Sequence, residues 1–305
     1  MDEREGLVVR THGGHYYVQT DDGEVDCTIR GRLKKERRET DLVVIGDRVI
    51  WTPTEEGYGI IEDVLPRERV LSRGLPPPRP GTYSDTEQVI VANPDQVLIV
   101  FSAASPPLNP FMLDRYLVAC EAGELPALIV INKVDILEDE EVLTLLEMYH
   151  RIGYSILLTS AESGEGLEAL REVMRNKLSA LTGPSGVGKS SLLNALWPEL
   201  DLRVGEVSEV HDRGRHTTVV SRLLRPEPDI YVADTPGLRQ FRFWDIDPEQ
   251  LEAFFPEMAP YLNECRFVPC THMHEPGCAV KDAVERGEIE PLRYESYARM
   301  FEHEF

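Results

Sequence analysis

Residues 183–190 read GPSGVGKS, and this stretch decides the class of fold. A short apolar segment at 178–181 precedes it, and a helical run at 191–197 follows it and ends before Pro198. Between a strand and a helix, the spacing GxxxxGKS is that of a phosphate-binding loop, whose glycines let backbone N–H groups turn around a phosphate. We expect Lys189 to reach the β and γ phosphates and the Ser190 hydroxyl to ligate Mg²⁺. The predicted phosphate-contacting residues are Gly183, Pro184, Ser185, Gly186, Val187, Gly188, Lys189, Ser190 and Ser191.

The segments before this loop alternate between strand and helix. The expected strands are 96–102, 127–131 and 155–159, and the expected helices are 110–122, 139–151 and 166–177. Asn109 and Pro110 supply a helix cap and a first-turn proline, and Gly123 supplies a stop. Short apolar runs that alternate with helical segments predict a parallel sheet covered on both faces, which is an α/β nucleotide-binding domain.

A candidate base-reading motif, Asn132-Lys133-Val134-Asp135, directly follows the strand at 127–131. This places it at the carboxyl edge of the sheet, where such folds bind nucleotides. An Asp can accept hydrogen bonds from guanine N1–H and the exocyclic amine together, and an Asn can serve the O6 side. Adenine would leave the carboxylate without donors. The sequence therefore predicts guanine as the base, with Ser160 and Ala161 at the end of the next strand as further contacts.

Two later segments add the parts that a nucleotide hydrolase needs around the γ-phosphate. The strand at 230–233 ends in Asp234-Thr-Pro-Gly237, a DxxG pattern. Its carboxylate can hold Mg²⁺ through water, and its glycine N–H can meet the γ-phosphate. The preceding segment GRHTT, at 214–218, could supply a threonine to the metal, from either Thr217 or Thr218. Together these motifs predict a GTP hydrolase that cleaves the β–γ phosphoanhydride bond.

The motifs stand in a permuted order. The base-reading residues precede the phosphate-binding ones, whereas ordinary GTPases run the other way. A parallel sheet needs its loops at one edge and not in one chain order, and permutation is tolerated where the termini lie close together. The sequence thus predicts a circularly permuted GTPase domain in which the helix at 166–177 bridges the former ends.

A third cluster follows, with the spacing Cys265-x4-Cys270-x-His272-x5-Cys278. Three thiolates and one imidazole match a closed tetrahedral zinc site, which would stabilise a segment too small for its own core. Four protein ligands leave no open position, so we expect a structural zinc ion. The alternative is a set of unmetallated core cysteines. His274 could compete as a ligand, and Cys27 and Cys120 are expected to be buried or free thiols.

The first seventy residues predict a separate β domain with a basic segment. The expected strands are 7–10, 16–20, 25–30, 48–52 and 60–64. They suit a small antiparallel barrel; the oligonucleotide-binding (OB) fold is one candidate and any other small β domain is the alternative. The basic side chains lie between two of the strands and are expected to contact RNA phosphates, unless they form an ordinary solvated face. They are Arg30, Arg32, Lys34, Lys35, Arg37 and Arg38.

A proline-rich run at 75–81 cannot continue a helix or a strand ladder and predicts a linker. The expected domains are an RNA-binding OB-like barrel at 1–72, a linker at 73–84, a permuted GTPase domain at 85–244 and a mainly helical zinc-binding domain at 245–305.

The composition and charge of the chain argue against a membrane-spanning protein, a secreted protein and a protein that coats nucleic acid. The 305 residues include 32 Lys and Arg against 54 Asp and Glu, a formal charge of −22, and 42% are hydrophobic. No apolar run is long enough to span a bilayer, and the first residues do not resemble a secretory signal. We expect a cytoplasmic monomer without membrane contact. The acidic excess argues against wholesale coating of nucleic acid, so any RNA contact must be local.

Nearly the full chain resembles one known family. The motifs GPSGVGKS, GRHTT, DTPG and CRFVPCTHMHEPGC, and an N-terminal CTIRG followed by basic residues, are similar to those of the RsgA (YjeQ/EngC) family of small-ribosomal-subunit biogenesis GTPases. The resemblance implies an OB-fold domain, a permuted GTPase domain and a zinc domain. It also implies a role in late maturation of the 30S subunit, with rRNA contact and with GTP hydrolysis that the particle stimulates.

The water-positioning residue is a separate question, because Leu238 occupies the place where Ras-like enzymes carry a glutamine. His216 is the candidate, as the resemblance also suggests; the alternative is that it only packs against or caps the switch. Arg213 and Arg215 are candidate internal arginine fingers. We hypothesise that GTP orders residues 205–218 and 234–244 and thereby changes how the zinc domain meets rRNA. Three other functions stay open: an ATPase, a nucleotide-sensing RNA scaffold without hydrolysis, and a GTPase that acts on the large subunit or on another RNA.

Overall fold

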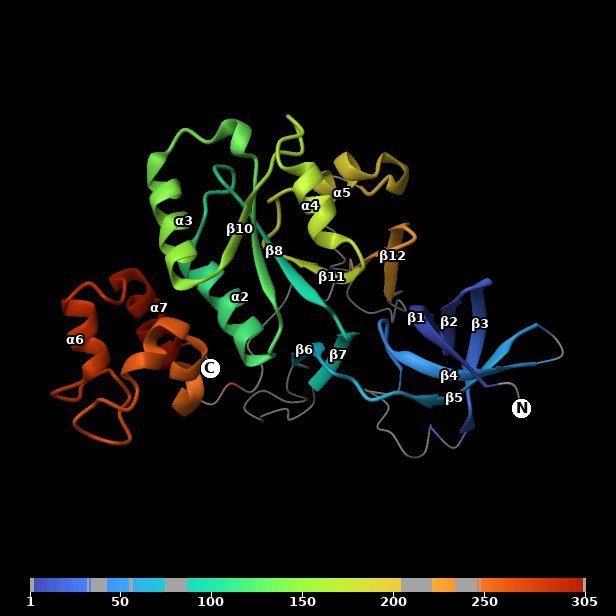
Figure 1. Ribbon diagram of the computed structural model, residues 1–305, viewed down its shortest axis with the longest axis horizontal. Helices are drawn as coiled ribbons and strands as arrows, with labels where there is room; N and C mark the ends of the chain where they lie inside the picture. The colour runs from blue at the N-terminus through green and yellow to red at the C-terminus, as the bar shows by residue number, and fades with distance from the viewer. Residues whose placement is uncertain are drawn as a thin grey trace, which may run out of the picture.

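Figure 1 shows the computed structural model of the chain, which describes residues 3–31, 33, 43–54, 57–74, 87–203, 221–233, 246 and 248–303. These residues form three parts. A β-barrel at the N-terminus, blue in the figure, stands beside a central α/β sheet in green and yellow, and helices in orange and red lie on the far side of the sheet. Among the described residues, no helix combines the length and the apolar character that crossing a membrane requires.

The N-terminal part is a closed five-stranded barrel. Its strands are β1 (Arg4–His12), β2 (His15–Thr20), β3 (Gly23–Ile29), β4 (Arg48–Pro53) and β5 (Gly59–Val64). The ring closes because β1 pairs with both β2 and β4, while β3 and β5 pair in parallel. The inside is apolar, with Val18, Cys27 and Trp51 all buried. The predicted small barrel is confirmed, and its five closed strands match the architecture of the OB fold.

In the described part of the chain, the central sheet has five parallel strands and one antiparallel strand. In spatial order these are β10 (Ser155–Leu158), β9 (Ala127–Asn132), β8 (Gln96–Ser102), β11 (Lys177–Thr182), β13 (Ile230–Ala233) and β12 (Ser221–Glu227). Every residue of the central strand β8 is buried. Since side chains alternate between the two faces of a strand, β8 contributes to an apolar core on each face.

Helices cover both faces of this sheet, as the alternating pattern predicted. The helices α2 (Pro110–Ala122) and α3 (Glu140–Ile152) pack in one core, and α4 (Leu167–Met174) and α5 (Lys189–Leu196) pack in the other (Figure 1). The Asn109 side chain caps α2 at 3.0 Å, and Gly123 ends it. The nucleotide motifs therefore lie on the loops between these layers.

Two predicted elements are wrong in length, and three of the described strands were not predicted. The strand expected at 7–10 extends over Arg4–His12. The helix expected at 166–177 ends at Met174, because Arg175 is extended, Asn176 has φ of +56°, and Lys177 already pairs with Ile230 as the first residue of β11. The strands that the sequence did not predict are β6 (Val70–Gly74), β7 (Glu87–Ala92) and β12. The first two pair with each other on either side of the proline-rich run, which lies outside the described residues.

The strand β12 joins the barrel to the central sheet. It pairs with β13 in the central sheet and with β1 of the barrel, where Arg10 lies opposite Arg222. Among the described residues, one sheet of eleven strands therefore runs from the central α/β domain into the barrel. This continuous ladder means that the barrel is held by backbone hydrogen bonds as well as by the chain connection.

The C-terminal part is mainly helical, as predicted. It contains the 3₁₀ helices η5 (Pro248–Phe254) and η6 (Pro256–Tyr261) and the α-helices α6 (Ala279–Glu285) and α7 (Pro291–His303). Its apolar core includes Val118 from α2, so it packs directly on the central domain. At the same junction Arg293 of α7, fully buried, pairs with Asp114 of α2 and Glu257 of η6.

Candidate functional site

The phosphate-binding loop connects β11 to α5, as predicted. At two positions of the loop only glycine fits without a steric clash. Gly183 has φ of +134°, and a Cβ there would lie 2.0 Å from the carbonyl oxygen of Val100. Gly188 has φ of +95°, and a Cβ there would lie 2.3 Å from Asn132 Nδ2. Any side chain at either position would therefore displace a neighbouring strand or the base-reading motif.

Lys189 lies with its ammonium over this loop. Its Nζ donates to the carbonyl oxygens of Gly183 and Pro184, both at 2.7 Å. A cation held at the opening of a glycine-rich loop by two neutral acceptors can exchange them for phosphate oxygens, to which charge-assisted hydrogen bonds are stronger. The loop thus carries its positive charge at the place where a phosphate-binding loop needs it.

The base-reading motif is tied to this loop by Asn132, the last residue of β9. The buried Asn132 side chain donates through Nδ2 to the carbonyl oxygen of Val187 at 2.9 Å, and its Oδ1 accepts from the Ala161 N–H at 3.2 Å. Lys133, in the left-handed region at φ of +66°, donates through Nζ to the carbonyls of Gly186, at 2.8 Å, and Ser105. Segments far apart in the chain therefore meet at one edge of the sheet.

Asp135 is the residue of this motif that remains exposed to solvent. Its Oδ1 accepts a hydrogen bond from Ser160 Oγ at 2.5 Å. The buried Ser160 hydroxyl is itself fixed, since it accepts from the N–H groups of Glu162 and Ser163 at 3.2 and 3.0 Å. Ser160 thus orients a carboxylate that could accept two donors from a guanine. Asn132, by contrast, already uses its amide to hold the loop.

Several predicted residues lie outside the described residues. They are Arg213, Arg215, His216, Thr217, Thr218, Asp234, Gly237 and Leu238 around the γ-phosphate motifs, and Arg32, Lys34, Lys35, Arg37 and Arg38 in the basic segment. The strand that leads to Asp234 is described, and Ala233 of β13 pairs in parallel with Ala180 of β11. The Arg30 side chain is about half exposed and pairs with Glu62 at 2.9 Å.

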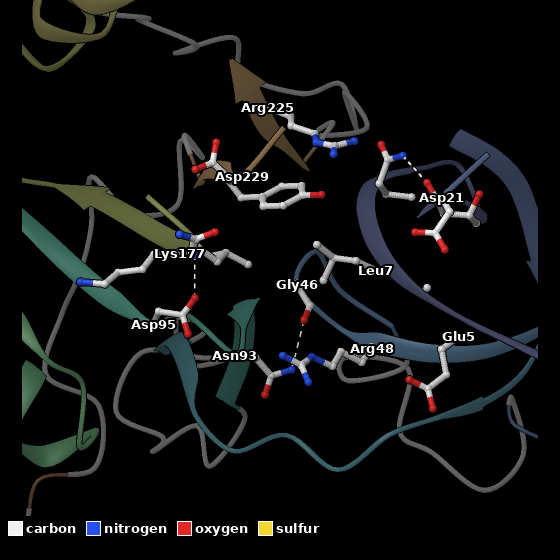
Figure 2. A pocket seen from close by; sticks show the side chains of 16 residues that line it. Glu5, Leu7, Asp21, Gly46, Arg48, Asn93, Asp95, Lys177, Arg225 and Asp229 are labelled. Carbon is white, nitrogen blue, oxygen red and sulfur yellow. Dashed lines mark hydrogen bonds between the residues drawn. The ribbon is translucent and has the colours of Figure 1, made fainter. Parts of the chain in front are cut away.

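A separate cleft of about 660 Å³ lies between the barrel and the central sheet (Figure 2). Arg48, Asp95, Lys177 and Asp229 are among its lining residues. It lies at the amino ends of the parallel strands, because Asp95 directly precedes β8 and Lys177 begins β11. The nucleotide motifs follow the carboxyl ends of the same strands, so this cleft lies at the opposite edge of the sheet.

The four predicted metal ligands come together in the C-terminal part. Their donor atoms all lie within 4.8 Å of one another. The Sγ atoms of Cys265 and Cys278 are 3.9 Å apart, and His272 Nδ1 lies 3.3 Å from Cys278 Sγ and 3.6 Å from Cys265 Sγ. Tetrahedral zinc with bonds of about 2.3 Å to sulfur and 2.0 Å to nitrogen separates such atoms by about 3.5 to 3.8 Å. The arrangement therefore fits a zinc-sized ion.

The chemistry of this cluster also calls for a cation. Burial raises the pKa of the Cys270 thiol to about 12, and it raises the pKa of Cys278 as well. A bound cation would be needed to keep such sulfurs as thiolates near neutral pH. His274 is exposed and is not part of the group, while Cys27 and Cys120 are buried free thiols as predicted.

Comparison with known proteins identifies the family. The RsgA GTPase family model matches residues 64–244, and the RsgA N-terminal domain model matches residues 5–61. The chain belongs to the RsgA GTPase family. The small ribosomal subunit biogenesis GTPase RsgA of Gemmatimonas aurantiaca is 47% identical over 299 residues, which are 97% of this chain and 95% of that protein. The protein of the same name from Moorella thermoacetica is 43% identical over 293 residues, covering 96% and 94% of the two chains.

Two solved structures share the whole fold of this RsgA-family chain. YjeQ from Thermotoga maritima has a TM-score of 0.78 at 37% identity and covers 98% of this chain and 97% of its own. YloQ, described as a circularly permuted GTPase, has a TM-score of 0.73 at 31% identity, covering 98% and 94%. The predicted permuted fold is thereby confirmed, and the chain is a GTP-hydrolysing enzyme.

Contacts that surround the cluster of three cysteines and His272 were not predicted. His272 Nε2 lies 2.6 Å from Glu252 Oε2 of η5, and the Tyr294 hydroxyl donates to the His272 carbonyl at 2.7 Å. A carboxylate on the outer nitrogen fixes the tautomer and the ring orientation, and leaves Nδ1 toward the sulfurs. No spacing rule connects Glu252 to the cluster, so its role becomes visible only in three dimensions.

Proposed function

We propose that this enzyme hydrolyses GTP during the late maturation of the 30S ribosomal subunit, and that binding to the particle and its rRNA stimulates hydrolysis. The observation that carries the nucleotide part is Asn132, which joins the base-reading motif to the phosphate-binding loop through Val187. One ligand that spans both motifs would be a guanine nucleotide. The ribosomal part is supported by relatives that carry this role in their names and match along nearly the whole chain.

In the proposed site, Asp135 reads the guanine, oriented by Ser160, while Lys133, Val134 and Ala161 line the base. The phosphates lie in the loop 183–191 against Lys189. Magnesium, which supplies charge neutralisation when bound, would be held by Ser190, by Thr217 or Thr218, and by Asp234, with Gly237 at the γ-phosphate. The steric needs of Gly183 and Gly188 and the position of the Lys189 ammonium support these roles.

For water positioning we propose His216, because Leu238 is apolar and cannot orient a water molecule. Arg213 and Arg215 are the candidates for stabilising charge on the transferred phosphoryl group. Replacing His216 with Ala should lower particle-stimulated turnover while nucleotide affinity stays unchanged. If affinity falls in step with turnover, His216 serves the structure of the switch and not the water.

For the metal cluster we propose a structural zinc ion held by Cys265, Cys270, His272 and Cys278. The sulfur and nitrogen separations and the soft donor set support zinc. With four protein ligands the site is closed, so the ion would stabilise the C-terminal part and would not take part in hydrolysis.

For RNA contact we propose the basic segment at 30–38 of the barrel, acting in the cytoplasm as a monomer. The segment is the main local concentration of positive charge in a chain of net charge −22. Neutral replacements of its six basic residues should flatten the salt dependence of subunit binding, because fewer counterions are released. An unchanged slope would assign RNA binding elsewhere.

The decisive experiment is GTP turnover by the purified protein alone, with 30S subunits and with 50S subunits. Strong stimulation by 30S only would support the proposed function, and a Lys189→Ala protein serves as the inactive control. Equal stimulation by 50S would move the proposal to another particle. With no stimulation by either particle, a nucleotide-sensing RNA scaffold would become the better explanation.

A further inference from the structure

An apolar groove of about 530 Å³ lies between the GTPase domain and the C-terminal helices. Four segments form its floor: Pro107 and Leu108 from the loop after β8, Ile136 and Leu137 from the segment after Asp135, Val142 and Leu145 from α3, and Leu292 from the first turn of α7. Large apolar side chains are left in solvent here, since Ile136 is 47% exposed and Leu292 is 38% exposed. A neighbouring cavity of about 320 Å³ shares Leu108 and Leu292 and extends the groove along α7.

The charged side chains around this groove are mainly acidic. Among the described residues, those that line the main groove are Glu138, Asp139 and Glu141, and the neighbouring cavity along α7 adds Glu295 and the basic Arg299. Asp139 has a structural role, because its side chain caps α3 by accepting from the Glu141 N–H at 2.8 Å. Glu138 and Glu141 form no ion pair with any basic side chain in the described part of the chain. Their carboxylates are therefore available to a cation from outside.

The groove also adjoins the base-reading motif. The loop that supplies Pro107 carries the Ser105 carbonyl that accepts from Lys133, and Ile136 ends the short 3₁₀ helix η2 (Val134–Ile136), which contains Asp135. Leu292 belongs to α7, the helix whose Arg293 is buried against Asp114. An occupant would thus touch the nucleotide domain near the base and the C-terminal part at the same time.

We propose that this groove binds a lysine- and arginine-rich protein segment that inserts apolar side chains. The apolar floor favours a partner with aliphatic or aromatic side chains, and the acidic rim favours one with positive charge. RNA does not fit, because its phosphates would face Glu138 and Glu141. A second copy fits poorly, since each chain carries a charge of −22. The chemistry of the groove does not depend on the proposed function. Only the origin of the bound segment does: if the enzyme acts on the ribosomal subunit, the segment would belong to a basic protein of that subunit.

The chemistry of the groove can be tested without any ribosomal particle. The probe is a fluorescein-labelled peptide of about twelve residues, roughly three helical turns, with leucines on one face and lysines on the other. Its matched control carries glutamates in place of the lysines. Fluorescence anisotropy with the full chain should show binding of the lysine peptide alone. Equal binding of both peptides would overturn the acidic rim as the determinant.

Variants then locate the binding. Leu292→Ser should weaken the lysine peptide about tenfold, because it removes an apolar side chain from the floor without adding charge. Ile136→Ser, in a floor segment outside α7, should also weaken binding, and it controls for a folding defect confined to α7. Glu138→Gln with Glu141→Gln should lower affinity about threefold and flatten its salt dependence. Glu285→Gln, an exposed acid on α6, should change nothing. Unchanged affinity in both floor variants would overturn the groove as the site.

A crosslinking experiment tests the source of the segment. Leu292 is replaced by the photoreactive p-benzoylphenylalanine, and Leu158, which is 37% exposed on β10, is replaced in the control. With purified 30S subunits, position 292 should crosslink to a basic protein segment and position 158 should not. Crosslinks to rRNA or to a second copy would overturn the proposal. Suppose that neither variant cosediments with 30S subunits, while the floor variants still weaken binding of the peptide. The proposed function would then be wrong, and the groove would remain a binding site for a basic segment.

Discussion

The central sheet and the C-terminal part are held together in different ways. In the sheet, apolar strands such as β8 are buried on both faces, and the nucleotide motifs are loops at the strand ends. In the C-terminal part, short 3₁₀ helices lie beside a cluster of three cysteines and a histidine, and a buried arginine pairs with one carboxylate of this part and one of α2. Polar side chains of the nucleotide motifs therefore contribute little to the packing of the central sheet. In the C-terminal part, buried polar side chains are themselves among the contacts that hold the fold together.

This difference predicts which substitutions alter activity and which alter folding. Side chains at the sheet edge contact loop carbonyls, so their removal should leave the apolar layers intact. In the C-terminal part, a missing ligand or ion partner leaves buried polar groups without compensation, which is costly.

The largest expected effect is that of metal removal. Structural zinc contributes about 10–16 kcal/mol of binding free energy in small zinc-binding folds, and much of this is folding free energy. A strong chelator should abolish hydrogen-exchange protection in residues 248–303 and leave the protection of β8 and β11 unchanged. Protection retained at both places would mean that the apolar core of the C-terminal part suffices without metal.

The second effect is that of Asp114→Ala. The substitution removes the carboxylate that Arg293 contacts and leaves the guanidinium buried with Glu257 alone. Breaking a buried ion pair on one side costs about 3–5 kcal/mol. Denaturant unfolding should report this loss. Asp114→Asn keeps an acceptor and should cost less; equal losses would show that charge matters more than hydrogen bonding at this junction.

The third effect is that of Lys189→Ala, which should separate activity from stability. Turnover of GTP should fall about 100-fold or more, because a preorganised cation at the phosphates is lost. The free energy of unfolding should change by less than about 0.5 kcal/mol, since Nζ donates to the Gly183 and Pro184 carbonyls at the surface of the loop and packs in none of the apolar cores. Lys177→Ala, at the other end of β11, is the matched control and should keep its turnover.

The smallest effect is that of Glu252→Ala on metal binding. The substitution removes the carboxylate 2.6 Å from His272 Nε2. Loss of such an outer contact lowers metal affinity about 10- to 100-fold. Competition with a chromophoric chelator measures it, and Glu285→Ala is the exposed control on α6. An affinity that stays at the level of the control would show that Tyr294 alone holds the histidine.

Local signals in the sequence were sufficient where a short stretch of chain decides the conformation. The bounds of β8 and α2 follow from an apolar run, a cap at Asn109 and a stop at Gly123. The phosphate-binding loop depends on glycines within eight residues, and the metal cluster depends on ligand spacing within one short segment. In each case the physical constraint acts between residues that are near neighbours in the chain, so the pattern of residue types carries it.

Tertiary structure decided what depends on distant partners. The sequence could not show that β12 pairs with β1, that Lys177 leaves the predicted helix to pair with Ile230, or that Glu252 reaches His272. The amide of Asn132 holds the loop at Val187, a contact that no local pattern reports. These contacts arise because strand pairing and burial bring together groups that are far apart in the chain, and their energy depends on the partner that the fold supplies.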